Sequence, residues 1–122
     1  MSANTICWTD IPVTDLDRAI AFYSAVLGEP VVRQSAGPDF EFGLLPHKDT
    51  ASGCLAVCED NKPSQAGPLI YLSVEGRLDA AAEVAKSQGG KILQERHQIG
   101  PYGFKVVILD SEGNRIALHS SK

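Results

Sequence analysis

The sequence predicts an α+β fold built from two tandem βαβββ modules, whose curved mixed sheets surround a cleft and carry their helices on the outer faces. Two observations predict this arrangement. A strand followed by an amphipathic helix occupies residues 5–28, and a similar unit follows at residues 68–90. Equivalent positions in the two halves, such as Val13 and Val74, lie a constant 61 residues apart in a chain of 122 residues. An internal period of half the chain indicates a duplication.

The chain has the length of a single domain that can bury a core of its own. Within it we expect module one at about residues 5–58, a linker at residues 59–67 and module two at about residues 68–120. The linker is predicted from its composition, which is polar and rich in turn-forming residues.

The first strand and the first helix have the clearest pattern. Residues 6–13 alternate between apolar and polar side chains, as a half-buried strand does. Thr14 and Asp15 then offer side-chain oxygens for a helix N-cap, and Gly28 and Pro30 end the helix. The apolar residues between these ends recur at helical spacing and form one face: Leu16, Ala19, Ile20, Tyr23, Val26 and Leu27.

Shorter apolar runs predict the remaining elements. In module one, strands are expected at residues 30–34, 40–45 and 53–58, separated by a turn at residues 35–39 and a polar loop at residues 46–52. In module two, strands are expected at residues 68–74, 91–97, 104–110 and 114–119, with a helix that contains Leu78, Ala81, Ala82 and Ala85 and ends at Gly89 and Gly90. Residues 111–113 form a hairpin turn, in which Gly113 suits a positive φ.

Alternation along each strand divides the side chains between the helix and the cleft. In the first strand, the helix-facing set is Cys7, Thr9, Ile11 and Val13, and the cleft-facing set is Ile6, Trp8 and Asp10. The 61-residue offset extends the cleft-facing set to Ala56, Cys58, Leu69, Tyr71, Ala117 and His119. Tyr102, in a loop with two glycines at residues 99–103, joins these candidates as the contact of a mobile flap. The alternative for that loop is an ordinary strand connection.

Composition argues against several classes of partner. The net charge is −4 and the Lys and Arg residues form no cluster, which does not favour nucleic acid. No apolar run approaches the ~20 residues of a membrane span, and no basic stretch followed by an apolar core opens the chain. Cys7, Cys54 and Cys58 are odd in number and lie in apolar stretches, so we expect free core thiols in a cytoplasmic protein.

Two stretches resemble a known family. Residues 11–23 (IPVTDLDRAIAFY) with residues 26–28 (VLG), and residues 109–118 (LDSEGNRIAL), are similar to the vicinal oxygen chelate superfamily of glyoxalases, bleomycin-resistance proteins and extradiol dioxygenases. The resemblance covers nearly the whole chain. It implies the two-module fold and a homodimer, whereas it says little about activity, because one fold hosts many functions.

The resemblance also implies where a metal would bind. In metal-dependent members, one His, Gln or Glu from each of four strands holds a divalent cation. Carried over position by position, these sites fall on Trp8, Ala56, Leu69 and Ala117. An indole donates only through its N–H, and Leu and Ala have no donor atom. We therefore expect no metal and no other cofactor, as in the bleomycin-resistance branch, which sequesters small molecules.

Several residues keep two interpretations. Trp8 can stack on a flat ligand or fill the space of a missing metal. Asp10 can be a general base in an apolar pocket, or it can lie at a wet cleft mouth or pair with an Arg. Histidines 47, 97 and 119 can hold a metal outside the family's positions, or they are scattered over the surface and the cleft.

Two functions from different classes follow. The first is a metal-free homodimer that binds or sequesters a small planar or aromatic molecule in its cleft. The second is a metal-independent lyase or isomerase that uses Asp10, Tyr71 or His119 as acid and base. A glyoxalase-type metalloenzyme with relocated ligands is a third alternative. The missing ligands favour the binding protein.

Overall fold

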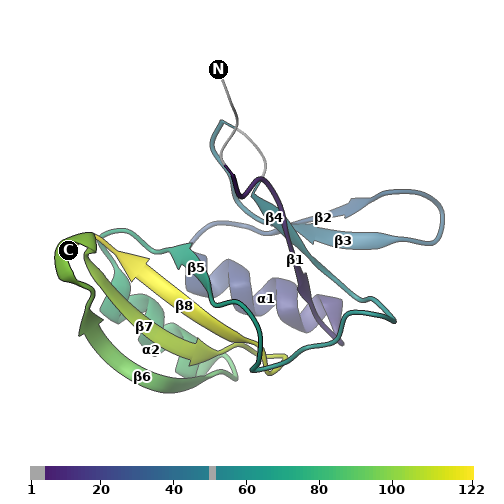
Figure 1. Ribbon diagram of the computed structural model, residues 1–122. Helices are drawn as coiled ribbons and strands as arrows, with labels where there is room; N and C mark the ends of the chain where they lie inside the picture. Colours follow the sequence, from purple (N-terminus) through teal and green to yellow (C-terminus); the bar gives the residue numbers. More distant parts are fainter. Residues whose placement is uncertain (1–4, 50–51) are drawn as a thin grey trace.

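The structure, a computed structural model, describes residues 5–49 and 52–122 and contains two modules of the same layout (Figure 1). Module one contains β1 (Thr9–Pro12), α1 (Leu16–Leu27), β2 (Val32–Ser35), β3 (Glu41–Leu44) and β4 (Gly53–Ala56). Module two contains β5 (Ile70–Ser73), α2 (Leu78–Ser87), β6 (Lys91–Gln98), the 3₁₀ turn η1 (Gly100–Tyr102), β7 (Phe104–Leu109) and β8 (Arg115–Ser120). The predicted α+β class with two βαβββ modules is confirmed.

Each module folds into its own four-stranded mixed sheet. The N-terminal sheet has the order β1-β4-β3-β2, and the C-terminal sheet has the equivalent order β5-β8-β7-β6. In both sheets the first strand runs parallel to the fourth, and the other pairs are antiparallel. The repeated topology is what a duplication of one unit produces.

Helix α1 begins and ends where its sequence indicates. The carboxylate of Asp15 accepts a hydrogen bond from the Arg18 N–H at 3.1 Å, which makes Asp15 the N-cap. At the other end Gly28 has a φ of 74°, a left-handed conformation that glycine adopts without steric cost. Both predicted signals are confirmed.

The two helices pack against each other and cover one face of each sheet, so that both modules share one core. On the N-terminal sheet, Ile11, Val13 and Leu55 are buried beneath α1. On the C-terminal sheet, alternate residues of β7 and β8 meet α2, and the buried contacts include Val106, Ile108, Ile116, Leu118, Leu78, Ala81 and Ala85. Figure 1 shows the sheets diverging from these helices, with the β2–β3 hairpin projecting from the body of the molecule.

A buried polar network joins the modules. The hydroxyl of Tyr23 on α1 donates to Asp110 Oδ2 at 2.5 Å, and Asp110 follows β7. The side-chain amide of Asn114 donates to the Pro12 carbonyl at 2.7 Å and to Asp110 Oδ2 at 3.0 Å. The turn between β7 and β8 thereby holds both the helix and the first strand of module one.

The strands are shorter than predicted at several ends. β1 begins at Thr9, and it pairs with β4 only between Thr9 and Pro12. Cys7, predicted to face the helix, therefore lies before the strand and is exposed, which corrects that part of the helix-facing set. β5 begins at Ile70, two residues later than predicted. Two positions of the predicted polar loop, residues 50 and 51, lie outside the described residues.

Neither helix in the described part of the chain has the length and apolar character that crossing a membrane requires.

Candidate ligand-binding site

The face of the N-terminal sheet opposite α1 contains a connected set of three side chains. Trp8 Nε1 donates to Asp10 Oδ1 at 2.8 Å, and the Cys54 thiol donates to the same oxygen at 3.3 Å. Parallel pairing of β1 with β4 places Asp10 beside Cys54, so both side chains leave the sheet on one face. Hydrogen bonds from the described residues to Asp10 use Oδ1 alone, which leaves Oδ2 available to a ligand that carries a donor.

The Cys54 thiol is held in its neutral form. Burial raises the pKa of Cys54 to about 12, and the hydrogen bond and negative charge of Asp10 act in the same direction. A neutral thiol is a weak nucleophile. Cys54 therefore serves as a donor to Asp10 and as part of the floor of this face.

Aromatic rings extend the same face toward the edge of the sheet. β3 pairs Phe42 with Ala56, and the rings of Phe40 and Phe42 are stacked with centroids 5.9 Å apart. Trp8 is 42% exposed and Phe40 is 40% exposed. Large apolar side chains this open to solvent on a sheet face indicate a surface that meets a ligand or a partner.

The corresponding face of the C-terminal sheet is formed by β5, β8, β7 and β6. Tyr71 on β5 is paired with Ala117 on β8, and Ser73 with His119, so the predicted residues Tyr71, Ala117 and His119 share this face. The Tyr71 and His119 rings meet edge to face, with centroids 6.4 Å apart. His119 Nε2 lies 2.6 Å from the Tyr102 carbonyl oxygen, which ties η1 to β8. Tyr102 itself is 76% exposed.

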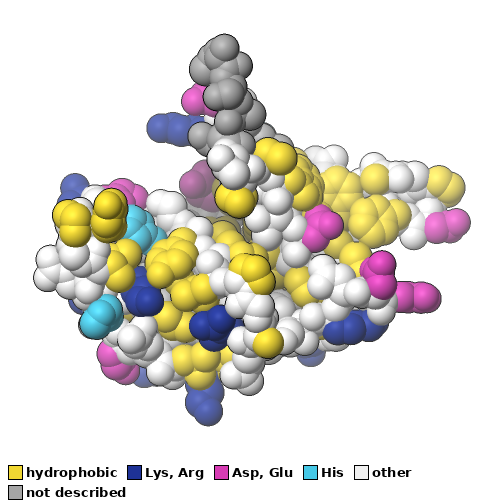
Figure 2. Space-filling model, viewed as in Figure 1, with side chains coloured by type: hydrophobic (Ala, Val, Ile, Leu, Met, Phe, Trp, Pro, Cys, Tyr) yellow, Lys and Arg dark blue, Asp and Glu magenta, His cyan; other side chains and the backbone are white. Residues whose placement is uncertain are grey.

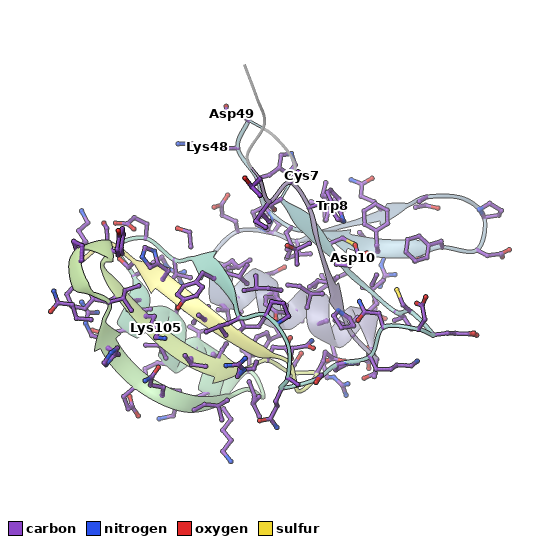
Figure 3. The ribbon with its side chains drawn as sticks, in the orientation of Figure 1. Cys7, Trp8, Asp10, Lys48, Asp49 and Lys105 are labelled. Atoms are coloured by element: carbon purple, nitrogen blue, oxygen red, sulfur yellow. The ribbon has the colours of Figure 1, made fainter. Side chains whose placement is uncertain are left out.

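The two faces do not form one site within the chain. They belong to separate sheets, and Figure 3 shows Trp8 and Asp10 beside β1 while Lys105 lies apart on β7. The structure thus brings Trp8, Asp10 and Ala56 together in one group, and Tyr71, Ala117 and His119 in a second group. Leu69 directly precedes β5, and the half-buried Cys58 follows β4.

The residues at the four positions where the resemblance would place metal ligands do not fit a metal ion. Trp8 presents an N–H that is already bonded to Asp10, and Ala56, Leu69 and Ala117 offer no donor atom. Across residues 5–49 and 52–122, no three His, Cys, Asp or Glu side chains gather as a set that could hold an ion. His47 lies in the β3–β4 loop of the N-terminal sheet and His97 on β6 of the C-terminal sheet, so the two histidines belong to different sheets.

The prediction that all three cysteines are core thiols is wrong in part. All three are free, but Cys7 is exposed, Cys58 is half-buried and only Cys54 is buried. The apolar residues beside Cys7 led to the prediction. Ile6, its neighbour, is 75% exposed, so this stretch is not part of the core.

Two contributors were missed from the sequence. From the sequence, Cys54 is expected only as a core thiol, because its contact with Asp10 joins residues 44 positions apart. Lys105 on β7 is absent from the predicted set, although strand pairing puts it on the same face as His119. Alternation along β7 puts Lys105 on the face opposite that of the buried Val106. This pattern could have identified Lys105 from the sequence.

A shallow pocket also lies where the linker crosses the module junction. Its lining includes Lys62, Ser64 and Asn114. The linker is bonded there: the Ser64 N–H donates to Asn114 Oδ1 at 3.1 Å, and Arg115 donates to the carbonyls of Gln65 and Gly67. These bonds make the pocket a packing feature of the junction.

Comparison with known proteins agrees with this architecture. The family model described as "Glyoxalase/Bleomycin resistance protein/Dioxygenase superfamily" matches residues 5–118. A lactoylglutathione lyase of Salmonella typhimurium is 28% identical over 123 aligned positions, which cover 93% of this chain and 90% of that protein.

Solved structures give the same fold at low identity. A glyoxalase/bleomycin resistance protein/dioxygenase family enzyme from Burkholderia phytofirmans PsJN superposes with a TM-score of 0.73 at 18% identity, covering 96% of this chain and 98% of that one. A V278E variant of glyoxalase I from Zea mays gives 0.72 at 23% identity, covering 94% of this chain and 45% of that one. A glyoxalase/bleomycin resistance protein from Streptomyces sp. CB03234 gives 0.70 at 19% identity, covering 94% and 99%.

Proposed function

Since the chain belongs to the Glyoxalase/Bleomycin resistance protein/Dioxygenase superfamily, we propose that it binds a small organic molecule against the open faces of its curved sheets without a metal ion. The observation that carries the proposal is the chemistry of Trp8, Ala56, Leu69 and Ala117. By the resemblance, these residues stand where metal-dependent members hold a cation, and none of them has a free donor atom to coordinate one. What these positions offer instead is an indole and apolar surface.

A flat, partly aromatic ligand suits this surface. The open indole of Trp8 and the stacked rings of Phe40 and Phe42 provide a wall on the N-terminal sheet. A ring that packs against such a wall gains roughly 0.5–1.5 kcal/mol beyond the burial of its area. Asp10 Oδ2 can accept a hydrogen bond from the ligand, which would fix its orientation.

We propose that a second copy of the chain completes the cleft. β1 and β5 are edge strands with unpaired backbone groups, and the faces beside them expose Trp8 and Tyr71. A two-fold pairing would bring the N-terminal sheet of one chain toward the C-terminal sheet of the other and cover both edges. Light scattering should give about 26 kDa, twice the 13.0 kDa of one chain. A stable monomer at micromolar concentration would refute the pairing.

The proposed location is the cytoplasm, where three free thiols would stay reduced.

Elemental analysis combined with ligand titration tests the proposal. Purified protein should contain far less than one equivalent of Zn, Ni, Fe or Mn, and the fluorescence of Trp8, the only Trp, should change saturably with an aromatic ligand. Trp8→Ala should weaken that binding, whereas His47→Ala should not. About one ion per chain, removed by chelator together with binding, would overturn the metal-free proposal.

A lyase or isomerase is the second candidate, because the similarity to lactoylglutathione lyase favours it. Asp10, Tyr71 and His119 are then the candidate acid and base, acting without a metal. Lactoylglutathione lyase activity that persists in the metal-free protein, and that falls in both Asp10→Asn and His119→Gln, would favour this enzyme over a binding protein. We take the binding protein as the better supported proposal.

A further inference from the structure

We propose that the C-terminal sheet contains an anion subsite, centred on Lys105, that binds the carboxylate or phosphate group of the ligand. This inference deepens the function proposed above and rests on it, because it assigns the acidic end of the molecule to one sheet. It uses residues that the family's metal positions do not include.

Strand register places Lys105 in the middle of a row of basic residues. Lys105 on β7 is paired with His119 on β8 and with His97 on β6. Directly paired residues project from the same face of a sheet, so the three side chains lie side by side opposite α2. Figure 2 shows Lys or Arg atoms and His atoms around an apolar patch on this face, at the lower left of the view.

Lys105 is half-buried and is held in place by an aromatic ring. Its Nζ lies 5.8 Å from the centre of the Tyr71 ring and donates to the Tyr71 hydroxyl oxygen at 3.5 Å. Because that oxygen acts as the acceptor, the Tyr71 O–H remains free to donate. The ammonium and the phenol together therefore offer donors to two oxygens of one carboxylate or phosphate.

The ammonium has no acidic partner among the described residues, whereas several other cations do. Arg18 pairs with Glu112, Arg33 with Asp17 and Glu41, and Arg96 with Asp79. No carboxylate in the described part of the chain lies within ion-pairing distance of Lys105. A partly desolvated ammonium without a counter-ion attracts an anion more strongly than one already neutralised.

The surroundings favour a small organic anion over a free ion. Ala117 and Val107 are buried and are paired with each other, and Ala117 is also paired with Tyr71. These residues lie next to Lys105 on the same face of the sheet. They provide apolar contact for the body of a ligand whose acidic group reaches Lys105. In the proposed pair of chains, the C-terminal sheet of one chain faces the N-terminal sheet of the other. The Asp10 carboxylate on that N-terminal sheet would repel the acidic group, so the two sheets would bind opposite ends of the molecule.

Matched probes test the subsite in the intact protein. 2-Naphthoate and its neutral analogue 2-naphthamide have the same ring system, and inorganic phosphate serves as a probe without a ring. Dissociation constants would be measured by ¹H–¹⁵N NMR titration at constant ionic strength. We expect naphthoate to bind about tenfold more tightly than naphthamide, as one charge-assisted hydrogen bond provides.

Variants attribute this difference to Lys105. Lys105→Met should bring the ratio of the naphthoate affinity to the naphthamide affinity close to one without weakening the binding of naphthamide. Lys105→Arg should keep most of the preference for naphthoate. Lys86→Met, on the exposed side of α2, removes the same charge elsewhere and should leave the ratio unchanged. The ¹H–¹⁵N spectrum of each variant shows whether it is folded.

The outcomes separate the subsite from the proposed function. Equal binding of the two naphthalene compounds, or a preference that survives Lys105→Met, overturns the subsite and leaves cleft binding intact. If neither compound binds, aromatic binding in the cleft is refuted and phosphate decides the subsite. In that case, chemical-shift changes that phosphate causes at β7 and β8 amides, and that vanish in Lys105→Met, support the subsite. The absence of such changes overturns the subsite.

Discussion

Replacing Glu112 with glutamine should destabilise the protein and flatten its stability profile at acidic pH. Glu112 lies in the turn between β7 and β8, yet its carboxylate binds the start of α1. Oε1 accepts from the backbone N–H of Thr14 at 2.9 Å and of Asp15 at 3.0 Å, and Oε2 accepts from Arg18 Nε at 2.7 Å. The Glu112 side chain is fully shielded from solvent. A carboxylate in this place satisfies free N–H groups and the positive end of the helix dipole together.

The magnitude follows from the proton affinity of this carboxyl. Burial alone would raise the pKa of Glu112, but the hydrogen bonds from Arg18, Asp15 and Thr14 outweigh burial and lower the pKa from 4.5 to about 2. At about 1.4 kcal/mol for each tenfold change in proton affinity, the limit is about 3 kcal/mol. Arg18 is half-exposed, so solvent screening reduces this figure. We expect Glu112→Gln to lower the free energy of unfolding by about 2 kcal/mol at pH 7.

The pH dependence has a definite sign. The folded-state pKa of Glu112 lies below the unfolded value, so its stabilisation is complete above about pH 4.5 and disappears as the pH falls toward 2. Urea unfolding followed by circular dichroism, at one protein concentration and at several pH values between 7 and 2, measures it. The difference between wild type and Glu112→Gln should shrink over that range.

A surface glutamate provides the control. Glu83→Gln removes an exposed carboxylate whose contact with Lys86 is 3.7 Å long, and we expect a change below about 0.5 kcal/mol. A Glu112→Gln effect that is as small as this, or that stays constant between pH 7 and pH 2, would refute the role assigned to Glu112.

Two further predictions concern buried groups. Tyr23→Phe removes the hydroxyl that donates to Asp110 Oδ2 and should lower the free energy of unfolding in urea by about 2 kcal/mol. The control Tyr102→Phe changes an exposed ring and should lower it by less than about 0.5 kcal/mol. Equal effects of the two variants would contradict the network at the junction. With the pKa of Cys54 at about 12, roughly one thiol in ten thousand is ionised at pH 8, so iodoacetamide should modify the exposed Cys7 well before Cys54. Peptide mass mapping measures both rates, and comparable labelling of the two in the folded protein would show that Cys54 is not shielded.

The sequence alone determined the architecture of this protein, because its signals are local. The alternation of residues 9–12, the helical stripe that follows and the ends marked by Asp15 and Gly28 depend on neighbours within a few positions. The 61-residue period then required a second copy of the same unit. The expectation of no metal also came from the sequence alone, because the resemblance places the family's ligand positions on residue types without a free donor atom.

Only the tertiary structure decided which polar groups meet. Glu112 contacts Thr14 across 98 positions, and Cys54 contacts Asp10 across 44. Such pairs depend on the strand register and on where a turn lands against a helix, and neither is encoded in local periodicity. The row of His97, Lys105 and His119 likewise required the pairing of three strands, with register shifts along β6. Side-chain alternation assigns residues to a face, but only the assembled sheet determines their neighbours on that face.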